Sequence, residues 1–143
     1  MSDETAPQAK GHTGGCLCGA VRYELAGEPR FAGYCFCADC RKASGSGFVG
    51  FMAVASSDVR FSGETRIFRS KSARGGEAVR NFCPVCGSLI FGGIVGVDTS
   101  HTIYAGSLDD PAVFRPTIAI FNRDRPVWAL MPPGLTVFET MPS

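Results

Sequence analysis

Seven cysteines, arranged in three groups, are the residues of this sequence whose type and spacing could do chemistry. In chain order the groups are Cys16 and Cys18; Cys35, Cys37 and Cys40; and Cys83 and Cys86. Thiolates are zinc ligands: a closed structural site uses four of them, and a catalytic site uses three protein ligands and keeps one position open. Seven is odd, so a complete set of internal disulfides is impossible. The partition into four and three ligands makes chemical sense.

The first predicted site is a structural zinc held by Cys16, Cys18, Cys83 and Cys86. Two cysteines three apart and followed by glycine form a knuckle, and residues two apart on a strand point the same way. The site would close a loop of about 65 residues and replace core that a small β-domain lacks. The alternative is a redox-active Cys83/Cys86 pair. Such a pair normally opens a helix in a βαβ unit, whereas the segment 88–91 is typical of a strand.

The second predicted site is a catalytic zinc held by Cys35, Cys37 and Cys40, with one position left for water or an outside ligand. Three thiolates make zinc a poor Lewis acid, so we expect it to present a bound thiolate rather than to make hydroxide. This favours thiol chemistry over hydrolysis. Other side chains could close the fourth position, and these are His12, His101 and Asp39.

The elements that must position these cysteines are short strands. The chain has 18 glycines and 9 prolines and few long helical patterns, which indicates an all-β domain. We predict one domain over residues 12–143, preceded by a disordered tail at 1–11, and one short helix at 39–44. The predicted strands are 20–25, 31–36, 48–54, 59–61, 65–69, 88–91, 102–105 and 116–121; segment 78–82 leads into the last cysteine pair, and 137–138 closes the domain.

Composition argues against several classes of protein. No apolar run approaches the length of a membrane span, and residues 1–10 do not resemble a signal peptide. A cytoplasmic location follows as the expectation, where clustered cysteines stay reduced and act as ligands or catalysts. The alternative is a disulfide framework in a secreted protein. The charges of the 14 Lys and Arg residues and the 13 Asp and Glu residues nearly cancel, which argues against a nucleic-acid-binding surface.

Three segments together resemble the glutathione-dependent formaldehyde-activating enzyme family. They are 15–23 (GCLCGAVRY), 35–45 (CFCADCRKASG) and 82–88 (FCPVCGS). The resemblance implies a β-tent fold built on a zinc ribbon, with several short antiparallel strands and one short helix. It implies carbon–sulfur lyase chemistry, the condensation of glutathione with formaldehyde to S-hydroxymethylglutathione. It also matches Cys16, Cys18, Cys83 and Cys86 to a structural zinc, and Cys35, Cys37 and Cys40 to a catalytic zinc.

The implied substrates are glutathione or another small thiol and a small aldehyde. Glutathione carries carboxylates, so we expect basic residues in its cleft, and the candidates are Arg41, Lys42 and Arg80. A nearby donor must protonate the developing alkoxide, for which Ser44, Ser46 and Arg41 are candidates because they follow the knuckle. The catalytic rate enhancement would come from holding the thiolate and the aldehyde together and from stabilising the oxyanion.

Two other functions are compatible with the sequence. One is a non-enzymatic zinc scaffold that binds a partner through an apolar surface made by Phe48, Phe51, Trp128 and Phe138. The other is a redox sensor that uses the cysteine trio. The sequence makes no prediction of oligomeric state.

Overall fold

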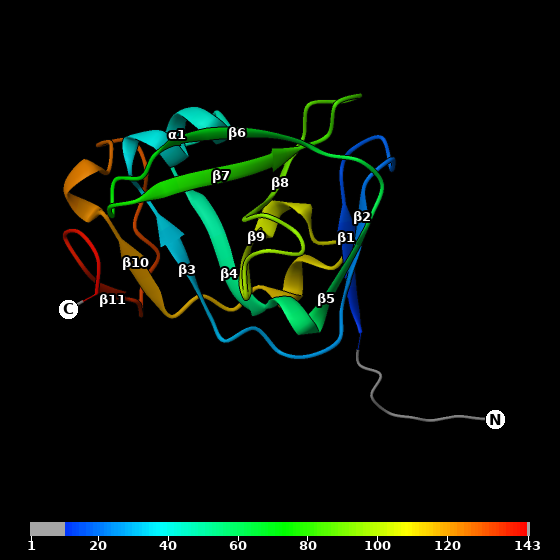
Figure 1. Cartoon of the computed structure of the whole chain (residues 1–143). Coiled ribbons are helices and arrows are strands. Elements are labelled where there is room, and N and C mark those ends of the chain that lie inside the picture. The colour runs from blue at the N-terminus through cyan, green and yellow to red at the C-terminus, as the bar shows by residue number, and fades with distance from the viewer. Residues whose placement is uncertain (1–10, 143) are drawn as a thin grey trace.

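The computed structural model describes residues 11–142, and these form two β-sheets with one short α-helix (Figure 1). The predicted tail therefore falls almost entirely outside the described residues. The strands are β1 (His12–Gly15), β2 (Arg22–Leu25), β3 (Phe31–Cys35), β4 (Val49–Ala55), β5 (Val59–Ser62), β6 (Arg66–Lys71), β7 (Glu77–Phe82), β8 (Leu89–Gly92), β9 (Ser100–Tyr104), β10 (Ile118–Ile120) and β11 (Thr136–Val137). The helix α1 spans Ala38–Ser44, and 3₁₀ turns lie at Ser56–Asp58, Ala105–Ser107, Pro111–Val113 and Asn122–Asp124.

The small sheet has the strand order β1-β2-β5, and the large sheet has the order β11-β10-β3-β4-β9-β8-β7-β6. Most neighbours are antiparallel, as predicted, but β10 runs parallel to both β3 and β11. Strand β1 was not predicted because His-Thr-Gly-Gly has no apolar alternation. It forms by pairing with β2, with His12 opposite Leu25.

Strand β4 is central because both of its faces are covered. Met52 and Val54 point into a core that also holds Tyr23 and Leu25 of the small sheet, and this core joins the two sheets. Val49 and Phe51 point to the opposite face. A strand buried on both faces needs a nearly continuous apolar run, and this is the pattern that predicted it.

The large sheet is strongly curved, so that β6 and β7 pass across β3 and β4 (Figure 1). Side chains from β3, β4, β7, β9 and β10 consequently line one cavity of about 550 Å³. Helix α1 follows β3 directly and stands beside this cavity. Among residues 11–142, no helix has the length and apolar character needed to span a membrane.

Candidate metal centres and the adjoining cavity

Four sulfur atoms, from Cys16, Cys18, Cys83 and Cys86, lie within 4.8 Å of one another. Cys18 Sγ is 3.7 Å from the sulfurs of both Cys16 and Cys83. The first pair lies in the turn after β1 rather than on a strand. Its sulfurs converge because the chain reverses there, with the N–H of Gly19 donating to the carbonyl of Cys16 (3.2 Å).

The second pair of this cluster sits on a knuckle between β7 and β8. The N–H groups of Val85 and Cys86 donate to Cys83 Sγ at 3.4 and 3.5 Å, and Gly87 closes the turn with a φ of +79°. The hydroxyl of Ser88 lies 3.2 Å from Cys86 Sγ and lowers the pKa of that thiol to about 5. Four converging sulfurs with N–H groups turned toward them fit a closed tetrahedral zinc site.

The second cluster contains the sulfurs of Cys35, Cys37 and Cys40, again within 4.8 Å of one another. Cys35 ends β3, Cys37 caps α1, and Cys40 lies in its first turn; the N–H of Cys40 donates to Cys37 Sγ (3.3 Å). Hydrogen bonds from Cys35 and then Cys40 lower the pKa of Cys37 to about 2, and the bond to Cys37 raises the pKa of Cys35. Gly45 ends the helix in the left-handed region, with a φ of +70°.

Three sulfurs of this kind are a donor set that suits zinc. Cys35 and Cys37 are buried, with 7% and 5% of their surface exposed. In the described part of the chain, no other cysteine, histidine or carboxylate joins the trio. The donor set is therefore the one expected for a site with three protein ligands.

Both histidines lie in other surroundings. His101 is buried, its Nδ1 donates to the carbonyl of Gly92 (3.0 Å), and its ring packs against Phe61 and Phe91. His12 pairs with Glu28, with 3.6 Å between Nε2 and Oε2. Neither is a member of a sulfur cluster within residues 11–142.

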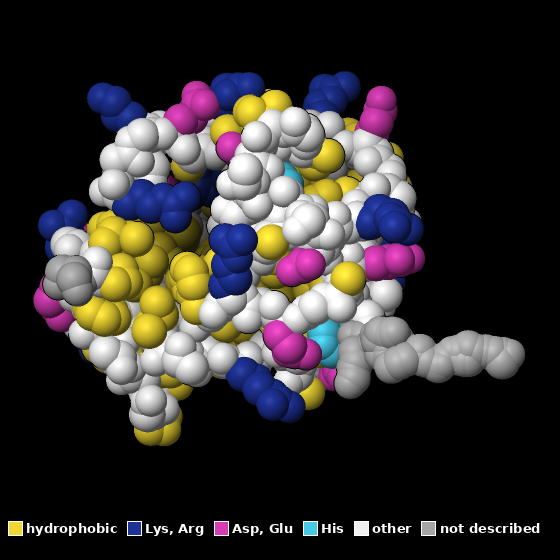
Figure 2. Space-filling model, turned by 60° about the horizontal axis from the view of Figure 1, so that its bottom comes forward, with side chains coloured by type: hydrophobic (Ala, Val, Ile, Leu, Met, Phe, Trp, Pro, Cys, Tyr) yellow, Lys and Arg dark blue, Asp and Glu magenta, His cyan; other side chains and the backbone are white. Residues whose placement is uncertain are grey.

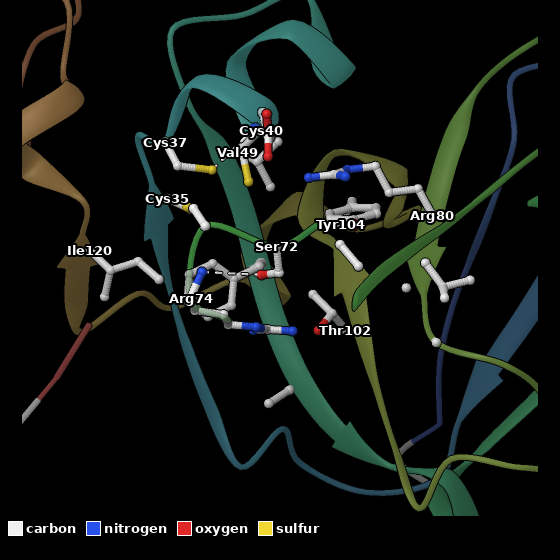
Figure 3. A pocket seen from close by; sticks show the side chains of 18 of the residues that line it. Cys35, Cys37, Cys40, Val49, Ser72, Arg74, Arg80, Thr102, Tyr104 and Ile120 are labelled. Atoms are coloured by element: carbon white, nitrogen blue, oxygen red, sulfur yellow. Dashed lines mark hydrogen bonds between the residues drawn. The ribbon is translucent and has the colours of Figure 1, made fainter. Parts of the chain in front are cut away.

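The cysteine trio lines the cavity formed by the curved sheet. Arg80 reaches into it from β7, and Arg74 reaches into it from the β6–β7 loop (Figure 3). Tyr104 lies beside Arg80, and burial raises the pKa of its hydroxyl to about 12. Arg80 Nη1 also donates to Ser70 Oγ (3.3 Å). The β7 side of the cavity is thus polar: it carries Arg80 and the carboxylate of Glu77, and the lining also includes Arg74 and Asp98.

The β10 side of the cavity is apolar. Ile120 pairs with Cys35 and Ile118 pairs with Gly33, so both isoleucines project from the same face as the trio. Phe51 and Phe31 continue this wall, their rings 6.0 Å apart and edge to face. Figure 2 looks toward a hollow with hydrophobic side chains gathered along one side and Lys or Arg side chains at its rim.

The predicted substrate contacts divide into two groups. Arg80 lines the cavity, whereas Arg41 and Lys42, on α1, are not among its lining residues. The role predicted for those two therefore stays a prediction. Ser44 donates to the carbonyl of Cys40 (2.8 Å) as part of the helix end, and neither it nor Ser46 lines the cavity.

Arg74 and Tyr104 line the cavity but were not predicted as site residues. Tyr104 ends β9, a strand in which the sequence shows no functional motif. Arg74 lies in a loop about 35 residues after the trio in the chain. The pairing of β9 with β4 places Tyr104 opposite Phe51, and the sequence carries no local signal of that pairing. No local motif marks Arg74. Phe121, also in the lining, is buried with a φ of +56°.

Comparison with known proteins gives one family. A family model described as glutathione-dependent formaldehyde-activating enzyme matches residues 11–124. A solved structure, the crystal structure of a Rhodobacter sphaeroides protein, is similar with 21% sequence identity and a TM-score of 0.49, over 88% of this chain and 98% of that chain. No curated protein matches the chain.

Proposed function

The chain belongs to the glutathione-dependent formaldehyde-activating enzyme family, and on this premise we propose that it is a zinc-dependent carbon–sulfur lyase. Its reaction joins glutathione, or another small thiol, to formaldehyde or a small aldehyde and forms an S-hydroxymethyl-type adduct. The observation that supports this most directly is the trio of Cys35, Cys37 and Cys40 on the wall of an open cavity. A second cluster of four sulfurs is available for a structural zinc.

Each cysteine of the trio would be a ligand of the catalytic ion. Zinc bound there supplies a positive charge that favours the thiolate form of an incoming thiol. The remaining contributions come from the protein chain. The cavity holds the two reactants together, so that their encounter no longer depends on diffusion.

The arginines are placed to hold the thiol. Arg74 and Arg80 both line the cavity, and guanidinium groups bind carboxylates through paired hydrogen bonds. Glutathione carries two carboxylates, one at each end of the molecule, with its thiol between them. With its carboxylates on the arginines, its sulfur can reach toward the trio.

The chemical step forms two bonds, C–S and O–H, and breaks two, S–H and the π bond of the carbonyl. The sulfur attacks the carbonyl carbon, so a carbon–sulfur bond forms while the S–H bond and the second C–O bond break. The hydrogen that leaves sulfur ends, through solvent, on the carbonyl oxygen. Tyr104 keeps its proton at neutral pH because burial raises its pKa to about 12. Its hydroxyl is therefore available as a hydrogen-bond donor to the oxyanion.

Exchange spectroscopy tests this function, because glutathione and formaldehyde also condense spontaneously. Magnetisation transfer between ¹³C-labelled formaldehyde and its adduct measures the exchange rate at equilibrium. We expect the zinc-loaded protein to accelerate the exchange and Cys40→Ser to abolish the acceleration. An exchange rate equal to the spontaneous one, with both zinc ions bound, would show that the proposed function is wrong.

A further inference from the structure

We propose that the carbonyl substrate of this protein carries an apolar chain of several carbons, rather than being formaldehyde alone. This inference rests on the proposed function and specifies its substrate class. It comes from the division of the cavity into a polar side that carries Arg80 and an apolar side.

The two sides of the cavity come from distant parts of the large sheet. Arg80 lies on β7 and Ile120 lies on β10, and four strands separate β7 from β10 in the sheet order. Figure 3 shows these two side chains on opposite sides of the space that the cysteines face. A bound molecule therefore meets positive charge on one side and hydrocarbon on the other.

The apolar side begins directly beside the sulfur trio. Ile120 and Cys35 are register partners on neighbouring parallel strands, so their side chains stand next to each other on one face. Ile118 and Phe51 follow on that face, and Met141 reaches the same space from the C-terminal segment. A substituent on a carbonyl carbon that reacts near the trio would meet this wall first.

The apolar wall is not fully covered by the protein itself. Phe31 is 50% exposed although its ring packs edge to face on Phe51. Met141 is half-buried. Apolar surface left open at a cavity gains free energy when a ligand covers it. Binding of a hydrocarbon chain against this wall is therefore favourable.

The size of the cavity supports the same conclusion. Its volume is about 550 Å³, within the range of about 300–1,000 Å³ that holds whole organic ligands. Formaldehyde has no side chain with which to touch the apolar wall. Arg80, on the side opposite the wall, would hold a carboxylate of the thiol away from it, so the wall is left to the aldehyde.

A homologous series of aldehydes tests the inference. With glutathione fixed, the acceleration over the spontaneous rate is measured for formaldehyde, propanal, butanal, pentanal and hexanal. Dividing by each spontaneous rate removes differences in intrinsic reactivity. If the wall binds the chain, the acceleration rises along the series from propanal to hexanal, by up to about threefold to fourfold per methylene group.

Two variants connect this trend to the wall. Met141→Gln keeps an unbranched side chain of similar length but makes it polar, and Ile120→Thr keeps the β-branch while removing hydrocarbon. Both should lower the ratio of hexanal to formaldehyde acceleration severalfold. Leu130→Gln is the matched control, because Leu130 is 81% exposed and does not line the cavity. This control should keep the wild-type ratio, and zinc content and melting temperature check the folding of each variant.

The outcomes separate this inference from the proposed function. Acceleration that is greatest with formaldehyde, or flat along the series, overturns the inference and leaves the lyase function in place. No acceleration with any aldehyde overturns both. A parallel series with fixed formaldehyde replaces glutathione by hexanethiol. Stronger acceleration with hexanethiol than with glutathione would assign the wall to the thiol and also overturn the inference.

Discussion

The sulfur atoms of Cys18 and Cys83 lie 3.7 Å apart although 65 residues separate them in the chain. The first belongs to the turn after β1, in the small sheet, and the second follows β7, in the large sheet. The contact therefore ties the two sheets together at one end of the molecule. A zinc ion held there would act as a crosslink between them.

Replacing Cys83 by alanine should unfold the domain or lower its melting temperature severely. A structural zinc in small peptide sites supplies about 10–16 kcal/mol, which is comparable with the whole stability of an ordinary domain. Thermal melts followed by circular dichroism, together with zinc analysis, provide the measurement. Val85→Ser is the matched control, because Val85 lies in the same knuckle but is 76% exposed. A stable Cys83→Ala protein would contradict a structural role for this site.

Replacing Cys40 by alanine should remove one zinc and leave the fold intact. The trio lies within one segment of chain, so a zinc there closes only a short loop and adds little crosslinking. Metal analysis should fall from two zinc ions per chain to one, with a melting temperature close to that of the wild type. Lys42→Ala, exposed on the same helix, should retain both ions. Global unfolding of Cys40→Ala would instead make both sites structural.

Replacing Arg80 by glutamine should weaken glutathione binding without affecting zinc. A hydrogen bond to a charged group contributes about 1.5–3 kcal/mol, so KM for glutathione should rise roughly tenfold or more. Steady-state kinetics at fixed aldehyde concentration measure it. Arg60→Gln removes the same charge from β5, away from the cavity, and should leave KM unchanged. An unchanged KM in Arg80→Gln would show that Arg80 does not bind the carboxylates of glutathione.

The ion pair between Arg22 and Asp109 should stabilise the fold in a pH-dependent way. The hydrogen bond from the Arg22 guanidinium, and to a smaller extent the one from the Thr13 hydroxyl, lowers the pKa of Asp109 from 3.8 to about 2. A lowered carboxyl pKa means stability that is present above about pH 4 and is lost as the pH falls toward 2. Asp109→Asn should therefore be less stable than the wild type at pH 7, with the difference shrinking below pH 4.

Urea unfolding midpoints at several pH values test this ion pair, with Glu24→Gln as a control that removes one carboxylate from exposed β2 surface. Zinc loss in acid affects all three proteins, so the comparison is between their midpoints at each pH. A difference between Asp109→Asn and the wild type that stays constant down to pH 2 would contradict the predicted titration.

Adding a methyl group at Gly33 should destabilise the β3–β10 pairing. A Cβ there would lie 2.6 Å from Ile118 Cγ1 and 2.7 Å from the Ile118 carbonyl oxygen, and the backbone oxygen cannot move aside freely. Overpacking of this kind costs about 1–3 kcal/mol. Denaturant unfolding of Gly33→Ala measures the cost. Gly106→Ala is the matched control, since its Cβ meets nothing within 4 Å; equal stability of the two variants would show that the sheet yields at Gly33.

Much of the local structure could be predicted because it depends on neighbouring residues. The all-β class and the short helix are confirmed, and each predicted strand overlaps an observed one. Strand β1 was missed because its residues show no apolar periodicity, and its extended conformation depends on pairing with β2. The parallel pairings of β10 were missed because strand direction depends on how the intervening chain returns to the sheet.

The sequence by itself determined the two cysteine sets and the family, because metal-ligand spacing is a local property that a motif records directly. Only the tertiary structure decided which side chains share the space beside the trio. Arg74, Arg80, Ile118 and Ile120 come together because the large sheet curves and brings β7 opposite β10. That arrangement depends on the pairing of distant strands and on the core shared with the small sheet, which no short segment of sequence encodes.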